Sequence, residues 1–170
     1  GRIDANKIHG MYMSIGGWGA YGIHINGTAT GVLIKNNFIY DIMTENYNAT
    51  SNLYNAFGIR ISSATTSTRI LNNTINLFDT VTLNSTAGLS ACVCITSASQ
   101  TGLDIRNNLF VNDQRTSLAG QWTNLIYYFA YTGGVPAGAT INYNNYYGTT
   151  NSGIGANSNF NIAAFTTSAS

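Results

Sequence analysis

Short strand patterns recur along the chain, each with apolar residues at alternate positions. They read Gly-Ile-His-Ile over residues 22–25, Gly-Ile-Arg-Ile over residues 58–61 and Cys-Val-Cys-Ile over residues 92–95. Alternation of this kind places the apolar side chains on one face of an extended strand. No window shows convincingly the i, i+3, i+4, i+7 spacing of an amphipathic helix. The pattern therefore predicts an all-β protein.

A second phrase follows each of these strands: an apolar residue, any residue, two asparagines, any residue and another apolar residue. Full copies span residues 34–39, 70–75 and 105–110, a degenerate copy spans 3–8, and a looser one spans 143–147. Aligned on the second asparagine, the copies fall at residues 6, 37, 73, 108 and 145, which gives steps of 31, 36, 35 and 37 residues. Repetition at such a period is typical of stacked units that bury their apolar faces against one another.

Each repeat contains a strand, a turn, a second strand, the Asn-Asn bend, a short strand and a long loop, which predicts a right-handed parallel β-helix. We expect a solenoid of about five rungs with long loops over residues 1–147. Residues 148–170, rich in Asn, Ser and Gly, should cap the last rung or continue into a further one. Equivalent strand residues should stack about 4.8 Å apart. The residues expected to be buried are Ile23, Ile25, Ile34, Ile59, Ile61, Ile70, Val93, Ile95 and Ile105.

The Asn-Asn step has a structural explanation. Asparagine tolerates the left-handed backbone region that a sharp bend between strands requires. Stacked asparagines also form hydrogen-bonded amide ladders between neighbouring strands. We predict such a ladder from Asn6, Asn37, Asn73, Asn108 and Asn145. Its disruption by Asn73→Val or Asn108→Val is expected to cost about 1–3 kcal/mol.

The repeated Ile-x-Asn-Asn-x-Ile phrase after a Gly-Ile-x-Ile strand resembles the right-handed parallel β-helix repeat of the pectate-lyase-like superfamily. The stretch from residue 103 to residue 147 more narrowly resembles large secreted β-helix proteins of Bacteroidota. That resemblance implies an extracellular or cell-surface location and an adhesin-like role. The superfamily also contains polysaccharide lyases and hydrolases, so the resemblance implies a carbohydrate-active enzyme as the alternative.

Charge is sparse in this chain. Only 8% of the residues are charged, against about 25% in a typical soluble domain. The net charge is +1 and the seven basic residues are dispersed, which argues against nucleic acid as a partner. No stretch approaches the roughly 18 consecutive apolar residues of a membrane span. Low charge with abundant Asn, Thr, Ser, Gly and Tyr is typical of secreted surface and fibre proteins.

The acidic residues are few and lie in different repeats: Asp4, Asp41, Glu45, Asp79, Asp104 and Asp113. A pectate-lyase-type site needs clustered acidic Ca²⁺ ligands and a basic residue, whereas hydrolases need two or three carboxylates on one face. Aligning the repeats instead places Asp4 beside Lys35 and Asp104 beside Arg69, as ion pairs on a solvated face. We therefore predict no catalytic residue, metal site or cofactor, while a site lying partly outside this chain keeps the enzyme alternative open.

The same alignment places His24, Arg60 and Cys94 in one column, and we interpret His24 and Arg60 as a solvent-facing pair. Cys92 and Cys94 lie two residues apart, so we expect both to face the same side, outward or into a covering loop. Side chains in this relation make a poor disulfide and, without a nearby histidine pattern, a weak metal site. Both cysteines are expected to be unpaired.

Tyrosine and tryptophan concentrate in the loops and in the last repeat. Such residues among Asn and Thr are used for sugar stacking and protein contacts. The candidate ligand-binding residues are Trp18, Trp122, Tyr127 and Tyr146. We favour a structural or adhesive segment of a larger surface or fibre protein, which binds a polysaccharide or another cell-surface ligand. Unpaired strand edges also predict end-to-end stacking, within a longer polypeptide or between copies of the chain.

Overall fold

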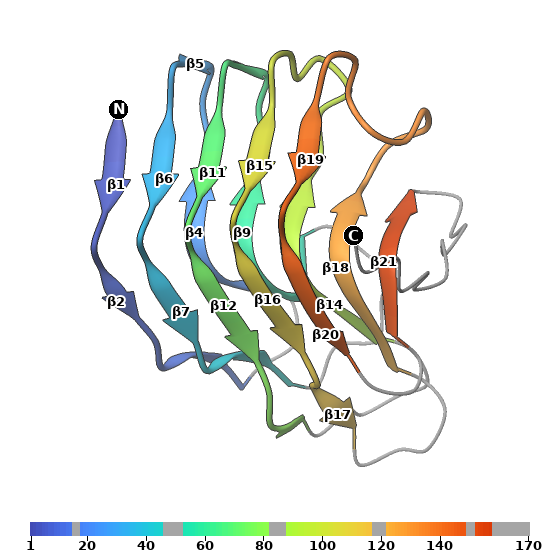
Figure 1. Cartoon of the computed structure of the whole chain (residues 1–170). Coiled ribbons are helices and arrows are strands. Elements are labelled where there is room, and N and C mark those ends of the chain that lie inside the picture. The colour runs from blue at the N-terminus through green and yellow to red at the C-terminus, as the bar shows by residue number, and fades with distance from the viewer. Residues whose placement is uncertain (15–17, 46–52, 82–87, 117–121, 149–151, 158–170) are drawn as a thin grey trace.

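Strands stacked in parallel rows make up the fold in the computed structural model (Figure 1). The structure describes residues 1–14, 18–45, 53–81, 88–116, 122–148 and 152–157, and of residues 116, 122 and 152–157 only the backbone. These residues include no helix, and hence none long and apolar enough to cross a membrane. The prediction of an all-β parallel solenoid is confirmed, with about four turns rather than about five.

Three five-stranded parallel sheets form the walls of the solenoid. The first contains, in spatial order, β1 (Arg2–Asp4), β6 (Leu33–Lys35), β11 (Arg69–Leu71), β15 (Asp104–Arg106) and β19 (Thr140–Asn142). The second contains β2 (Lys7–Ile8), β7 (Phe38–Tyr40), β12 (Thr74–Leu77), β16 (Leu109–Asn112) and β20 (Asn145–Gly148). The third contains β4 (Ala20–Ile25), β9 (Ala56–Ile61), β14 (Gly88–Ile95), β18 (Trp122–Phe129) and β21 (Ser152–Asn157). Figure 1 shows each strand of the first sheet continuing into the second, with β4, β9 and β14 of the third sheet behind them and β18 and β21 to the right.

Short parallel pairs supplement these walls. They are β5 (Ala29–Thr30) with β10 (Thr65–Thr66), β3 (Met11–Met13) with β8 (Ile42–Thr44), and β13 (Thr80–Val81) with β17 (Arg115–Thr116). By their place in the chain, the first pair connects the third sheet to the first, and the other two connect the second sheet to the third. The solenoid therefore keeps its neighbouring rungs in register at the corners as well as along the walls.

The register of the first sheet agrees with the repeat alignment. Ile70 pairs with Ile34 on one side and with Ile105 on the other. Ile3 and Ile141 extend the same row at its two ends. The predicted stacking of equivalent isoleucines in neighbouring rungs is therefore confirmed.

The core contains eight of the nine residues predicted to be buried, all at 6% exposure or less. The exception is Ile25, which is only partly buried. Its strand, β4, is the edge strand of the third sheet among the described residues, so a neighbouring strand covers one side only. The prediction for Ile25 was wrong: it is the last residue of this edge strand, whereas Ile23 within the same strand is buried.

The two cysteines are free and buried, as unpaired strand residues, but they do not face the same side. Cys92 and Val93 both belong to the main core, whereas Cys94 belongs to a second apolar cluster with Phe57 and Tyr128. Two consecutive inward residues mark a bend in β14 that interrupts the alternation on which the prediction relied. Burial raises the pKa of both thiols, so neither is a reactive thiolate at neutral pH.

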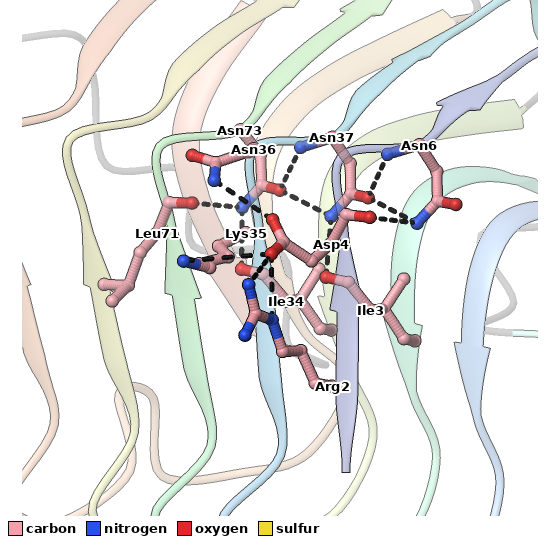
Figure 2. A network of polar contacts seen from close by, with 10 residues as sticks. All are labelled: Arg2, Ile3, Asp4, Asn6, Ile34, Lys35, Asn36, Asn37, Leu71 and Asn73. Atoms are coloured by element: carbon pink, nitrogen blue, oxygen red, sulfur yellow. Dashed lines mark hydrogen bonds and ion pairs between the residues drawn. The ribbon is translucent and has the colours of Figure 1, made fainter.

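An asparagine ladder runs along the bend between the first two sheets and consists of Asn6, Asn37, Asn73, Asn108 and Asn144. Figure 2 shows its first three members. The main-chain N–H and Nδ2 of Asn37 donate to Oδ1 of Asn73 at 3.0 and 2.9 Å. Asn73 donates in the same way to Asn108 at 2.8 and 3.0 Å, and Asn108 donates to Asn144 at 2.9 Å from both groups. Each rung is thus bonded to the next through a side chain as well as through its strands.

Asn145 is not part of the ladder. It is exposed, opens β20 and pairs with Leu109, so the ladder position of the last repeat belongs to Asn144. The residue before each ladder asparagine carries the left-handed conformation, with φ of 57° at Ala5, 55° at Asn36, 55° at Asn72, 58° at Asn107 and 54° at Tyr143. The two asparagines of the phrase therefore have separate tasks: the first turns the chain and the second bonds to the neighbouring rung.

Candidate functional site

The carboxylates of the first sheet are engaged in local ion pairs. Asp4 accepts from the Arg2 guanidinium and lies 3.8 Å from Nζ of Lys35, as Figure 2 shows. The bond to Arg2 is the main cause that lowers the pKa of Asp4. Asp104 accepts two hydrogen bonds from Arg106, at 2.5 and 2.6 Å. The predicted pairing of Asp4 with Lys35 is confirmed, whereas Asp104 bonds within its own strand.

Of two other carboxylates, Asp41 and Asp79, the first acts on the second. Burial raises the pKa of Asp79, and the charge of Asp41 raises it further. Within the part of the chain that the structure describes, no group of three or more His, Cys, Asp or Glu side chains is placed to hold a metal ion. Glycoside hydrolases use a pair of carboxylates, and Asp41 with Asp79 is a pair in which the charge of one carboxylate acts on the other.

A groove on the outer side of the third sheet brings together a different set of side chains. The groove, here called the Trp18 groove, has a volume of about 530 Å³ and is lined by Trp18, Tyr21, His24, Asn26, Leu53, Arg60, Ser62 and Thr96. His24 and Arg60 are register partners on β4 and β9. Asn26, Ser62 and Thr96 each follow directly after a strand of this sheet, so their side chains meet at one end of the groove.

Arg60 forms the buried wall of the Trp18 groove. Arg60 is only 4% exposed. The guanidinium lies over the ring of Tyr21, 5.0 Å from the ring centroid, and Nη1 donates to Nε2 of His24 at 2.6 Å. The prediction of a solvent-facing His24–Arg60 pair is therefore wrong for Arg60: the histidine is exposed, but the arginine is packed behind it.

His24 accepts a hydrogen bond in this arrangement and does not act as a free base. A guanidinium can only donate, so Nε2 of His24 is the acceptor and the ring proton lies on Nδ1. Oγ of Ser62 lies 2.8 Å from the same Nε2. Burial lowers the pKa of His24, and the charge of Arg60 lowers it further. Because Arg60 already occupies the Nε2 lone pair, Ser62 and His24 do not form an activated nucleophile and base.

We expect this contact to make the stability of the protein depend on pH. The unfolded chain takes up a proton on His24 near pH 6.5, whereas the folded chain takes it up at lower pH. Stability should therefore fall as the pH drops below about 6.5 and level off once folded His24 is protonated. Since His24 is exposed, the change in melting temperature should be small.

Thermal denaturation at about pH 7.5 and about pH 5 tests this expectation. His24→Gln should reduce the difference in melting temperature between the two pH values. His9→Gln removes the other histidine, which stacks on Tyr40 away from the groove, and should leave the difference unchanged. The same pH dependence in wild type and His24→Gln would contradict the assignment.

The four aromatic residues proposed from the sequence have different surroundings. Trp18 is 70% exposed and lines the groove. Tyr127 is buried at 3% exposure, and its hydroxyl lies 3.1 Å from that of Tyr146, which is partly buried at the last rung. These two rings pack against one another between β18 and β20, and a ligand-binding role for them stays a prediction. The side chain of Trp122 lies outside the described residues.

A second surface, on the outer face of the second sheet, carries exposed apolar side chains set among Thr74, Asn76 and Asn145. Phe38 and Leu109 lie in one outward row, and Tyr40 and Tyr147 lie in the next. Phe38 and Leu109 are each 41% exposed and Tyr147 is 56% exposed. This flat strip contrasts with the Trp18 groove, which is hollowed and contains polar side chains.

Comparison of the chain with protein family models, with curated proteins and with solved structures found no match. The function is therefore inferred from the repeat, the fold and the groove.

Proposed function

We propose that this chain is a structural and adhesive segment of a larger extracellular surface or fibre protein, and that its Trp18 groove binds a glycan. The low charge and the resemblance to secreted β-helix proteins of Bacteroidota support the extracellular location. The solenoid supplies a rigid body that further rungs, within one polypeptide or from another copy, can extend. The observation that carries the binding role is the exposed Trp18 indole beside buried and polar groups in one groove.

The groove has the physical features of a sugar site. An exposed indole offers a flat apolar face on which a sugar ring can stack, and its burial by a ligand removes a large apolar surface from water. The hydroxyls of Ser62 and Thr96 and the amide of Asn26 can exchange hydrogen bonds with sugar hydroxyls. A volume of about 530 Å³ lies within the range of ligand pockets, roughly 300–1,000 Å³.

The apolar strip on the second sheet supports adhesion in a different way. Its rows of exposed Phe38, Leu109 and Tyr147 offer a flat surface to a broad partner rather than a pocket to a small ligand. The segment would then hold a surface through the strip and recognise a saccharide through the groove.

Removing the indole tests the binding role. Trp18→Ala is expected to weaken glycan binding roughly tenfold or more, because a central stacking contact is lost. Binding of wild type and variant to a panel of oligosaccharides, followed by titration calorimetry on the best ligand, measures the change. Tyr143→Ala is the matched control: Tyr143 is 76% exposed, and Ala5 occupies the equivalent left-handed position in the first repeat.

Equal binding by Trp18→Ala and wild type would contradict the groove as the binding site, and so would a wild-type protein that binds none of the panel. The second candidate function is a carbohydrate-active enzyme, for which the Asp41 and Asp79 pair is the favouring observation. Release of reducing ends or unsaturated uronides from the same panel would favour that function over adhesion.

A further inference from the structure

We infer that the Trp18 groove selects sugars that carry an anionic group, a carboxylate or a sulfate, and that Arg60 recognises this group. The inference rests on the proposed glycan binding and specifies which class of glycan the groove takes. It follows from three features of the groove: its charge, the way in which the guanidinium is held, and the polar groups around it.

The first feature is the sign of the charge. Among the described residues that line the groove, Arg60 is the one with a permanent charge, and none is Asp or Glu. In a chain with a net charge of +1 and only 8% charged residues, a lining of this kind is a local positive site. It attracts anions and disfavours amino sugars and lysine side chains.

The second feature is the fixed position of the guanidinium. The Tyr21 ring holds one face of the group at 5.0 Å from the ring centroid. The 2.6 Å bond from Nη1 to His24 fixes its orientation in the plane. A planar guanidinium held in this way loses little conformational entropy when it binds a planar or tetrahedral oxyanion through paired N–H donors. Because Arg60 is 4% exposed, its charge acts in a medium less polar than water and its interactions are correspondingly stronger.

The third feature is what surrounds the charge. Trp18 supplies an apolar face, while Asn26, Ser62 and Thr96 supply amide and hydroxyl groups. A free inorganic anion would use Arg60 but would leave the indole uncovered. A neutral sugar would use the indole and the hydroxyls but would make no use of the positive charge of Arg60. A sugar ring with an attached oxyanion uses all three kinds of group at once.

Matched oligosaccharides of one sugar, in neutral, carboxylated and sulfated forms, test this selectivity by titration calorimetry. Wild type should bind the preferred anionic form roughly tenfold or more tightly than the neutral form, as expected for one charge-assisted hydrogen-bonded contact. Arg60→Gln should bring the ratio close to one while neutral binding persists. Arg60→Lys keeps the charge without the planar fork and should retain part of the preference.

Arg69→Gln is the control for the loss of one positive charge, because Arg69 is exposed on β11 of the first sheet, and it should bind as wild type does. Circular dichroism establishes that each variant is folded. If Arg60→Gln fails to fold, two other measurements test the inference: the anionic preference of Arg60→Lys and the salt dependence of wild-type binding. Binding to a charged ligand should weaken with added salt. The carboxylated and sulfated arms show which oxyanion is preferred.

Equal affinity of wild type for neutral and anionic forms would overturn this inference and leave glycan binding in place. An anionic preference that persists in Arg60→Gln would also overturn it. Binding of inorganic sulfate as tight as that of the sulfated oligosaccharide would contradict the role of the indole and with it the sugar assignment. No binding to any form would remove both the selectivity and the proposed function.

Discussion

Asn73→Val is expected to lower the free energy of unfolding by about 3 kcal/mol or more, because several buried groups would each lose a hydrogen bond worth about 1–3 kcal/mol. Oδ1 of Asn73 accepts from two groups of Asn37, at 3.0 and 2.9 Å. Its Nδ2 donates to the carbonyl oxygen of Ile34 at 3.0 Å and to Asn108 at 3.0 Å. Valine fills similar space but offers none of these groups, so Asn37 in the preceding rung and Asn108 in the following rung would both lose hydrogen bonds.

Urea denaturation of wild type and variant measures the loss. Asn6→Val is the matched control, since Asn6 belongs to the same ladder but is exposed at its first rung. There water can replace the lost partners, and we expect a loss below about 1 kcal/mol. Equal losses at both positions would show that burial of the ladder does not set its energy. An unchanged midpoint for Asn73→Val would refute the ladder as a stabilising element.

The ladder has a direction that bears on how the solenoid grows. In every rung, the main-chain N–H and Nδ2 of one asparagine donate to Oδ1 of the next, from Asn6 towards Asn144. A rung that carries an asparagine in the same position can therefore extend the row in the same direction. This complementarity is the physical basis for the predicted end-to-end stacking, which stays a prediction.

The repeat in the sequence predicted the register of the solenoid well, because it combines two independent constraints. Isoleucine rows must be buried, and the asparagine must meet its counterpart in the next rung. The last repeat shows the limit of this reasoning. It contains Asn144 and Asn145 in succession, and with Tyr143 in the left-handed position the alignment shifts by one residue. Sequence spacing alone did not distinguish the asparagine that bonds from the one that follows.

The Trp18 groove could be predicted only in part. The column of His24, Arg60 and Cys94 followed from the repeat alignment, and its register is confirmed. The burial of Arg60 did not follow, since it depends on the Tyr21 ring, which lies against the guanidinium, and on a groove that Trp18 and Leu53 also line. An arginine at an outward position with an aromatic residue three positions earlier in the adjacent strand was the available signal.

The glycine that opens the Gly-Ile-x-Ile strand pattern is explained by the bend in the third sheet. A Cβ atom at Gly58 would lie 2.5 Å from Cγ2 of Ile75 and 2.7 Å from the carbonyl oxygen of Cys92. Gly22 is crowded in the same way by Ile39 and by the carbonyl oxygen of Gly58. The core is therefore closed at this point in the first two rungs, and the absence of a side chain lets the second and third sheets approach.

Gly58→Ala is accordingly expected to destabilise the protein by about 1–3 kcal/mol, in spite of the single added methyl group. The contact with Ile75 can relax if that side chain moves, but the contact with the Cys92 carbonyl oxygen requires the backbone of β14 to shift. Gly58→Ala combined with Ile75→Val should therefore recover only part of the loss. Chemical denaturation of both variants measures the two contributions separately.

Cys92→Ala is the positional control for this experiment. Cys92 follows Gly58 along the same row in the next rung, where the core accepts a side chain and Sγ lies 3.6 Å from the carbonyl oxygen of Val111. Alanine there removes one atom without creating a clash, so the loss should be smaller than that of Gly58→Ala. If Gly58→Ala is as stable as wild type, the inferred close approach of the second and third sheets at Gly58 is wrong. If Ile75→Val restores the full stability of Gly58→Ala, the loss comes from the contact with the Ile75 side chain alone. The contact with the Cys92 carbonyl oxygen of the neighbouring strand then contributes nothing.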